Sequence, residues 1–219
     1  MHPAAGNVDI MEMLFTVLLA LAAFLLAAVP FSVLIGRWGL HKDITTYGDG
    51  NPGAANVFKA GNKAAGLLAV ALDVSKGIPF VYLSQALFGM PVLGTVFIAI
   101  CAVLGHAFSP FRGWHGGKAI AVTFGVMLGL PQYDILLAFI VFVLIGFFFI
   151  EVDAWKMVFG SSATLVYLLI THGLSWEPLL MVVLLAIMII KHYEALHTLP
   201  HFHGLLLRWV QGIIRSSTL

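Results

Sequence analysis

The sequence contains few charged residues: Asp, Glu, Lys and Arg make up 10% of its 219 residues. A soluble domain carries about 25%. This shortage, together with 61% hydrophobic residues, predicts an integral membrane protein. The net charge of +1 gives no indication of nucleic-acid binding. The single cysteine, Cys101, lies in an apolar run and excludes a disulfide framework within one chain. We interpret it as a small core residue.

Basic residues are also absent from the start of the chain, where the first Lys or Arg is Arg37. A secretory signal begins with a basic region, so we expect the first apolar run to be a retained membrane helix. A spanning helix needs roughly 20 apolar residues, fewer where protein shelters an end. On this criterion we expect seven membrane helices, at residues 10–34, 64–88, 92–105, 119–130, 133–150, 154–170 and 178–190. The predicted fold is an all-α, seven-transmembrane-helix bundle over residues 1–200.

The positions of Lys and Arg alternate between the predicted loops. The N-terminal tail and the second, fourth and sixth loops contain none. The other loops and the C-terminal segment contain Arg37, Lys42, Lys59, Lys63, Arg112, Lys118, Lys156, Lys191, Arg208 and Arg215. Because cytoplasmic loops collect Lys and Arg, we expect the N-terminus outside and the C-terminus in the cytoplasm. An even number of helices would break this pattern.

Residues 201–219 form a separate segment at the C-terminal end. In a helix, Phe202, Leu205, Trp209 and Ile213 would share one face, and basic residues lie among them. We expect an amphipathic tail that lies on the anionic membrane surface.

The longest polar run is residues 47–63, YGDGNPGAANVFKAGNK. Its glycines and proline are poor helix formers, so the run is expected to form a turn rather than to continue a helix. Turns of this kind can direct backbone N–H groups toward an anion. Asp49, Asn51 and Asn56 add hydrogen-bonding side chains, and Lys59 and Lys63 add positive charge. The alternative interpretation is a solvated loop between two membrane helices.

A second polar loop, residues 105–118, ends in Gly116-Gly117-Lys118 immediately before an apolar run. Free N–H groups at a helix start, the positive end of the helix dipole and a lysine together can hold a phosphate. An ordinary helix start is the alternative. The motif lacks the spacing and the Ser/Thr of a Walker sequence. His106 in this loop is either a hydrogen-bonded structural residue or part of the same site.

Two further polar centres lie at membrane helices. Asp73 and Lys76 sit inside the second predicted span, where charges pair with each other or face a polar cavity. Residues 191–194, Lys-His-Tyr-Glu, lie at the cytoplasmic end of the seventh. Each centre could be structural or could contact an anionic substrate. All four centres fall on the predicted cytoplasmic side, which favours a site for a phosphorylated substrate beside a lipid-accessible cleft.

Other kinds of site have weaker support. The chain has nine histidines but neither HExxH nor CxxC, so we predict no metal site and no cofactor. A transporter is expected to show an internal repeat with broken helices in both halves, and none is recognisable. A transporter or channel for a small anion nevertheless stays an open alternative.

Five segments together resemble the acyl-phosphate:glycerol-3-phosphate acyltransferases, the PlsY family. They are VPFSVLIGR at 29–37, GNPGAAN with FKAGNK at 50–63, DVSKG at 73–77, GHAFSPFRGWHGGKA at 105–119 and KHYEAL at 191–196. Their order and spacing match over nearly the whole chain. The resemblance implies a seven-helix enzyme of the cytoplasmic (inner) membrane with a cytoplasmic active face. It would transfer a fatty acyl group from acyl phosphate to glycerol 3-phosphate, giving lysophosphatidic acid. Its partners would be these two substrates and the surrounding membrane lipids.

The resemblance also implies roles for residues at matching positions. The implied catalytic residues are His106, Lys118, His192 and Glu194. The implied substrate-binding residues are Asp49, Asn51, Gly53, Asn56, Lys59, Lys76, Gly116 and Gly117.

The chain departs from the family pattern at five positions. The family usually has Ser at Asp49, Thr at Ala55, Arg at Lys59, Lys at His115 and Asn at Ala195. Asp49 places a negative charge where an anion would bind, and Lys59 lacks the two-pronged phosphate contact of Arg. These departures motivate a second hypothesis, a catalytically impaired homologue that serves as a structural or lipid-binding subunit of a membrane complex.

Overall fold

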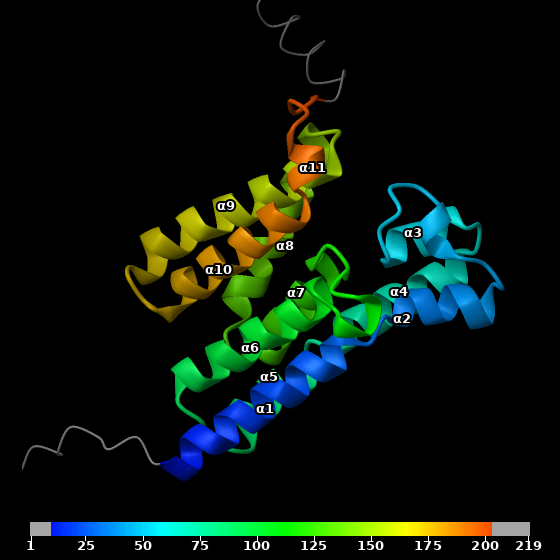
Figure 1. Ribbon diagram of the computed structural model, residues 1–219. Coiled ribbons are helices and arrows are strands. Elements are labelled where there is room, and N and C mark those ends of the chain that lie inside the picture. The colour runs from blue at the N-terminus through cyan, green and yellow to red at the C-terminus, as the bar shows by residue number, and fades with distance from the viewer. Residues whose placement is uncertain (1–9, 203–219) are drawn as a thin grey trace, which may run out of the picture. The chain divides into compact units, whose positions relative to one another are not determined.

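The computed structural model describes residues 10–202, and helices dominate this range (Figure 1). The helices are α1 (Ile10–Ala28), α2 (Phe31–Leu34), α3 (Ala54–Lys59), α4 (Lys63–Ser75), α5 (Pro79–Ala86), α6 (Val92–Ala107), α7 (Ile120–Gly129), α8 (Tyr133–Phe149), α9 (Asp153–His172), α10 (Trp176–Lys191) and α11 (Tyr193–Leu196). The only strand-like pairing within residues 10–202 is an isolated bridge between Ile150 and Phe202. The predicted amphipathic tail lies outside the described residues from position 203 onward.

Four helical segments are long and apolar enough to cross a membrane. They are Ile10–Gly39, Lys63–Ala86, Val92–Arg112 and Asp153–His172, and α7 and α8 are shorter apolar helices. The all-helical membrane prediction is therefore confirmed, and the helix bounds lie close to the expected ones. Two predicted spans are not single α-helices. The first is interrupted at Pro30, after which α2 forms and leads into a π-helix, Ile35–Gly39. The second breaks between α4 and α5, before Pro79.

The chain divides into two compact units, residues 1–131 and 132–219. In the first, α1 lies along α6, α4 packs against α7, and α5 packs against α6. In the second, α9 packs against both α8 and α10.

Glycine permits close helix packing in both units. A Cβ added to Gly105 of α6 would collide with the backbone of Phe24 in α1, and one added to Gly125 of α7 would collide with the Val74 carbonyl in α4. In the second unit, a Cβ on Gly160 of α9 would lie 2.9 Å from Val143 Cα in α8. Small residues at such crossings let backbones approach and gain van der Waals contact, the main attraction between helices in lipid.

Residues 47–63 do not form only a turn, because they contain the six-residue helix α3. The sequence predicted a turn here and did not indicate the separate helix at residues 54–59. The glycines and the proline are confined to the ends of the run, and Gly53 stands at the N-cap of α3. The intervening segment buries Val57 in an apolar cluster with Ile44, Ala60 and Ala69. Burial of this face compensates for the weak intrinsic helix tendency of a short segment.

Candidate functional site

The Asp49 carboxylate organises the first polar loop. Its Oδ1 accepts hydrogen bonds from the Asn51 backbone N–H, at 3.1 Å, and from the Asn56 side-chain amide, at 2.9 Å. The Asn56 amide also donates to the Asn51 carbonyl, at 2.8 Å. Gly48 and Gly50 on either side adopt positive φ angles of 61° and 72°, a conformation that glycine adopts without strain. The carboxylate thus occupies the donors that the sequence suggested for an external anion.

Lys118 from the second loop joins this arrangement. Its ammonium group donates to Asp49 Oδ2 at 2.5 Å, which links residues 69 positions apart. The Lys59 ammonium lies beside Gly48, where an added Cβ would approach it to 2.6 Å. Two predicted cations of the first and second loops are therefore close to Asp49.

The electrostatic state of Asp49 follows from these contacts. Partial burial acts to raise the pKa of its carboxyl, but hydrogen bonds from Lys118, the Asn51 backbone and Asn56, with the charge of Lys118, outweigh burial and lower the pKa from 3.8 to about 2. Asp49 is therefore ionised at neutral pH. Since the folded-state pKa is depressed, its contribution to stability is complete above pH 3.8 and is lost as the pH falls through about 2.

The turn at Gly116 and Gly117 differs in one respect from the expected phosphate loop. The N–H groups of these glycines are not free, because they donate to the carbonyls of Ala107, at 3.2 Å, and His106, at 3.0 Å. The glycines instead permit close contact: a Cβ at Gly116 would collide with the His106 carbonyl, and one at Gly117 with the His106 ring. The helix itself, α7, begins at Ile120, one residue after the predicted start, because Ala119 is its N-cap.

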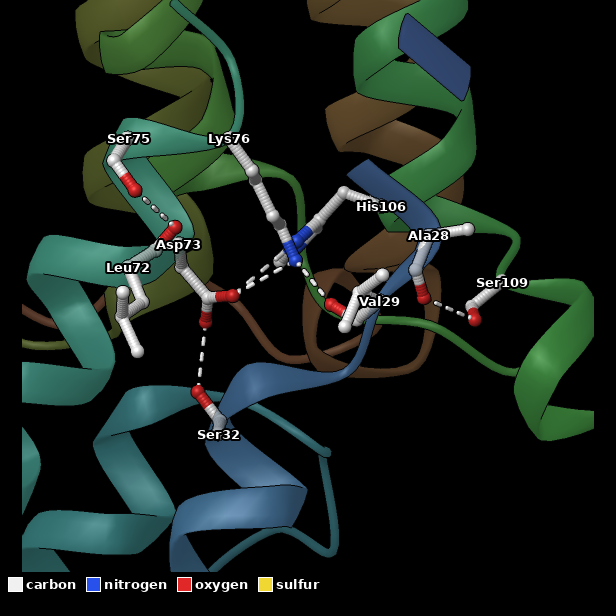
Figure 2. A network of polar contacts seen from close by, with 9 residues as sticks. All are labelled: Ala28, Val29, Ser32, Leu72, Asp73, Ser75, Lys76, His106 and Ser109. Atoms are coloured by element: carbon white, nitrogen blue, oxygen red, sulfur yellow. Dashed lines mark hydrogen bonds and ion pairs between the residues drawn. The ribbon is translucent and has the colours of Figure 1, made fainter. Parts of the chain in front are cut away.

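Beneath these loops lies a buried polar network (Figure 2). The Asp73 carboxylate accepts from the Lys76 ammonium at 2.8 Å and from the Ser32 hydroxyl at 2.7 Å, and His106 Nδ1 lies 4.0 Å from Asp73 Oδ1. Lys76 also donates to the Val29 carbonyl, at 3.0 Å. Figure 2 shows the Lys76 and His106 side chains converging on the Asp73 carboxylate, where both lie nearest to Oδ1. The exposed fractions of Asp73 and Lys76 are 2% and 4%, so water does not screen this pair.

A small cavity of about 10 Å³ brings three of the predicted polar centres together. Pro52 of the first loop, Gly116 and Gly117 of the second, and Lys76 with His106 of the network all line it. This volume is near the lower limit for one water molecule. A phosphorylated substrate therefore requires the walls of the cavity to separate.

The fourth predicted centre lies in the second unit. His192 is 2% exposed at the junction of α10 and α11, and its Nδ1 is 2.8 Å from the Met188 carbonyl oxygen. Glu194 is exposed on α11.

Sequence reasoning missed three polar residues of the first unit. Ser32 bonds Asp73, and Ser109 donates to the Ala28 carbonyl at 2.6 Å, which fastens the second loop to the end of α1. Arg112 lines the cavity. Ser32 lies two residues after Pro30, inside the first predicted span, and Ser109 directly precedes Pro110 in the second polar loop. A polar residue beside a proline at the end of an apolar run is the signal that could have identified each serine.

Among residues 10–202, no group of three or more His, Cys, Asp or Glu side chains is placed to hold a metal ion. The candidate site consists of Lys ammonium groups, His side chains, loop amides and the carboxylates of Asp49 and Asp73. This donor set suits electrostatic binding of phosphate.

Comparisons with known proteins agree with this chemistry. The family model described as glycerol-3-phosphate acyltransferase matches residues 17–201. A glycerol-3-phosphate acyltransferase from Ralstonia pickettii (strain 12J) is 34% identical over 180 residues, covering 81% of this chain and 86% of the relative. One from Streptococcus pyogenes serotype M5 (strain Manfredo) is 31% identical over 195 residues, covering 85% and 91%.

Solved structures agree with the sequence comparisons. The crystal structure of PlsY (YgiH), an integral membrane glycerol 3-phosphate acyltransferase, in its glycerol 3-phosphate form has a TM-score of 0.77 and 25% identity, covering 89% of this chain and 98% of that one. Its lysophosphatidic acid form has a TM-score of 0.73 and 26% identity, covering 84% and 90%. With a family model that spans most of its length and relatives more than 30% identical, this chain belongs to the glycerol-3-phosphate acyltransferase family, the family of PlsY.

Proposed function

We propose that this protein transfers a fatty acyl group from acyl phosphate to glycerol 3-phosphate in the membrane, giving lysophosphatidic acid and inorganic phosphate. The observation that carries the proposal is the convergence of Lys76, His106, Gly116 and Gly117 with the first loop around one cavity. Family membership supplies the reaction class.

The reaction itself requires little from a protein base. A hydroxyl oxygen of glycerol 3-phosphate attacks the acyl carbonyl carbon, and the bond from that carbon to the phosphate oxygen breaks. The departing phosphate can take up the hydroxyl proton, so atoms and charge balance. The protein must hold two anions together and offset their repulsion, a task for which placement and fixed positive charge are effective.

Specific roles follow for the predicted residues. Lys118, with Lys59 and His106, would bind substrate phosphate, and Lys76 would provide positive charge at the cavity. Asn51, Gly53 and Asn56 would shape the first loop, while Gly116 and Gly117 hold the second loop against His106. His192 and Glu194 stay proposed catalytic residues on the strength of their place in the KHYEAL segment.

Substrate binding would involve an exchange of anions at Lys118. In the structure, the Asp49 carboxylate accepts a hydrogen bond from the Lys118 ammonium group. Entry of a phosphate would require Asp49 to give up the contact, and the movement of its loop would carry Pro52 away from the cavity. The Asp49 carboxylate therefore competes with the substrate phosphate for the Lys118 ammonium group.

Replacing Asp49 with serine is expected to lower the KM for glycerol 3-phosphate about three- to ten-fold, because Lys118 loses its internal anion. The measurement is acyl-phosphate turnover by the purified wild type and variant over a range of acceptor concentrations. Asp49→Asn is the matched control, since it removes the charge but keeps the shape of the side chain, and it should give a similar decrease. A higher KM in both variants would contradict the competition.

The Asp49–Lys118 ion pair also supports the alternative of a catalytically impaired homologue that acts as a structural or lipid-binding subunit. The same assay separates the two functions. No turnover by the wild type or by Asp49→Ser, combined with stable co-purification of a membrane partner, would favour the subunit.

We further propose seven spans in a cytoplasmic membrane, with the N-terminus outside and the candidate site facing the cytoplasm. The support is the alternation of Lys and Arg between loops. In a Cys101→Ala background, a membrane-impermeant maleimide should label Leu174→Cys on intact cells and His115→Cys only after permeabilisation. Both positions are exposed, so access to the side chain does not limit the reaction. The reverse labelling pattern would invert the topology.

A further inference from the structure

A second pocket, much larger than the first, opens beside the candidate site. Its volume is about 430 Å³. The lining residues are Val33, Arg37, His41, Lys42, Asp43 and Arg112. Arg112 lines both this pocket and the small cavity, so the two adjoin at its side chain. We refer to the larger one as the basic pocket.

Local backbone structure gathers these charges. The π-helix Ile35–Gly39 ends the first apolar segment, and the chain then reverses sharply, with the Lys42 N–H donating to the Gly36 carbonyl at 3.0 Å. His41 in this reversal has a φ of 52°, which is uncommon for a residue other than glycine. Arg112 reaches the pocket from the short 3₁₀ turn Pro110–Arg112.

The pocket carries an excess of positive charge. Arg37, Lys42 and Arg112 oppose the single carboxylate of Asp43, which leaves two positive charges without counting His41. The pKa of Asp43 is lowered mainly by hydrogen bonds from the Thr45 hydroxyl and N–H, with smaller contributions from Arg112 and Arg37, so this carboxylate stays ionised. The ionised Asp43 carboxylate balances one of the three basic side chains, so a net charge of two remains in the pocket.

The arginines retain capacity to bind an anion. Within the part of the chain that the structure describes, neither Arg37 nor Arg112 forms a salt bridge, and the buried Nε of Arg112 has no hydrogen-bond partner. Lys42 is engaged differently, since its ammonium group donates to the Ala60 carbonyl at 2.7 Å. A buried guanidinium N–H without an acceptor is costly and is satisfied when an acceptor arrives.

We propose that the basic pocket is a binding site for a phosphate monoester, held by Arg37 and Arg112. A phosphate monoester carries close to two negative charges at neutral pH, which matches the excess charge of the pocket. Arginine forms paired hydrogen bonds to phosphate oxygens, and the two side chains come from separate elements that can enclose the group.

The position of Arg37 favours a lipid headgroup over a free phosphate. Arg37 lies near the end of the candidate span Ile10–Gly39, and the adjacent Trp38 side chain is 71% exposed. Trp residues at span ends are typical of the membrane–water interface, the depth at which headgroups lie. Lysophosphatidic acid has a phosphate monoester headgroup and serves as the probe. Only this choice of probe rests on the proposed reaction; the proposal of a phosphate site does not. A headgroup held here would adjoin the candidate site through Arg112.

The test is equilibrium binding of oleoyl lysophosphatidic acid to the purified full-length protein in phosphatidylcholine nanodiscs. A Lys118→Ala background weakens the candidate site by removing one of its cations, the one proposed to bind substrate phosphate. Adding Arg37→Gln should weaken binding about ten-fold or more, since a charged hydrogen bond is lost. Lys63→Gln is the matched control, because it removes the same charge from an exposed lysine outside the pocket. Its effect should stay below about two-fold.

Two further probes identify the source of the phosphate. Oleoyl lysophosphatidylcholine, which has the same acyl chain but a zwitterionic headgroup, should bind at least ten-fold more weakly than lysophosphatidic acid. If glycerol 3-phosphate or inorganic phosphate binds as tightly as the lipid and responds to Arg37→Gln, the pocket takes a soluble phosphate and the lipid assignment is overturned. Unchanged lysophosphatidic acid binding in Arg37→Gln would overturn the site. These readouts do not require turnover, so they are separate from the proposed reaction.

Discussion

Replacement of Lys118 by alanine is expected to lower kcat/KM for acyl transfer to glycerol 3-phosphate by at least about 100-fold, the usual effect of removing one preorganised donor from a charged reaction centre. Lys118 is the residue through which the two polar loops meet, at Asp49. Its loss would remove a cation from the substrate and leave the Asp49 carboxylate unopposed, so an incoming phosphate would meet repulsion.

The control for this prediction is Lys63→Ala. Lys63 is exposed at the start of α4, and Lys63→Ala makes the same change in net charge as Lys118→Ala. Unlike Lys118, Lys63 forms no ion pair with Asp49. Its activity should remain within about two-fold of wild type, as expected for screened surface charge. Because the Asp49–Lys118 pair is partly exposed, Lys118→Ala should leave the thermal unfolding midpoint nearly unchanged. Full activity of Lys118→Ala would contradict its assignment.

Replacement of Lys76 by alanine is expected to have the largest effect on stability, about 3–5 kcal/mol, because it leaves the Asp73 carboxylate buried without its ion-pair partner. Asp73 and Lys76 are almost inaccessible to solvent, and without Lys76 the carboxylate would keep only the Ser32 hydroxyl and the His106 ring, 4.0 Å away, as polar neighbours among the contacts described above. The measurement is equilibrium unfolding of the purified protein in mixed detergent micelles, with helix content as the signal.

The double variant Lys76→Met with Asp73→Asn separates loss of the pair from loss of packing. It removes both charges while keeping side chains of similar volume, so most of the stability should return, as for other buried pairs that are replaced together. A single variant Lys76→Ala that unfolds within about 0.5 kcal/mol of wild type would show that the pair is not the structural centre inferred from its burial. Activity should fall in both variants, because Lys76 also lines the cavity.

The helical character of the chain and most of its helix bounds follow from the sequence. Helices α7, α8 and α9 begin and end within two residues of the predicted limits, because a long apolar run between polar turns has few alternatives in a membrane. The sequence motifs also identified the family and the reaction class, since these depend on residue types and spacing along the chain.

Local reasoning failed where a contact depended on distant residues. Helix α3 is stabilised because Val57 packs in an apolar cluster with Ile44 and Ala69. Helix propensities along the sequence do not predict these contacts. The Gly116 and Gly117 N–H groups were expected to be free, yet the preceding segment supplies the carbonyls that accept from them. In both cases, the contacting residues are brought together by the tertiary fold.

Tertiary structure alone decided how the charges are paired. Asp49 and Lys118 are far apart in the sequence, and the choice of each other as partners follows from the packing of the helices beneath their loops. The same packing places Arg112 between the small cavity and the basic pocket. The sequence determines which charges the protein carries, but Coulomb interactions act through space, so only the fold determines which of those charges meet.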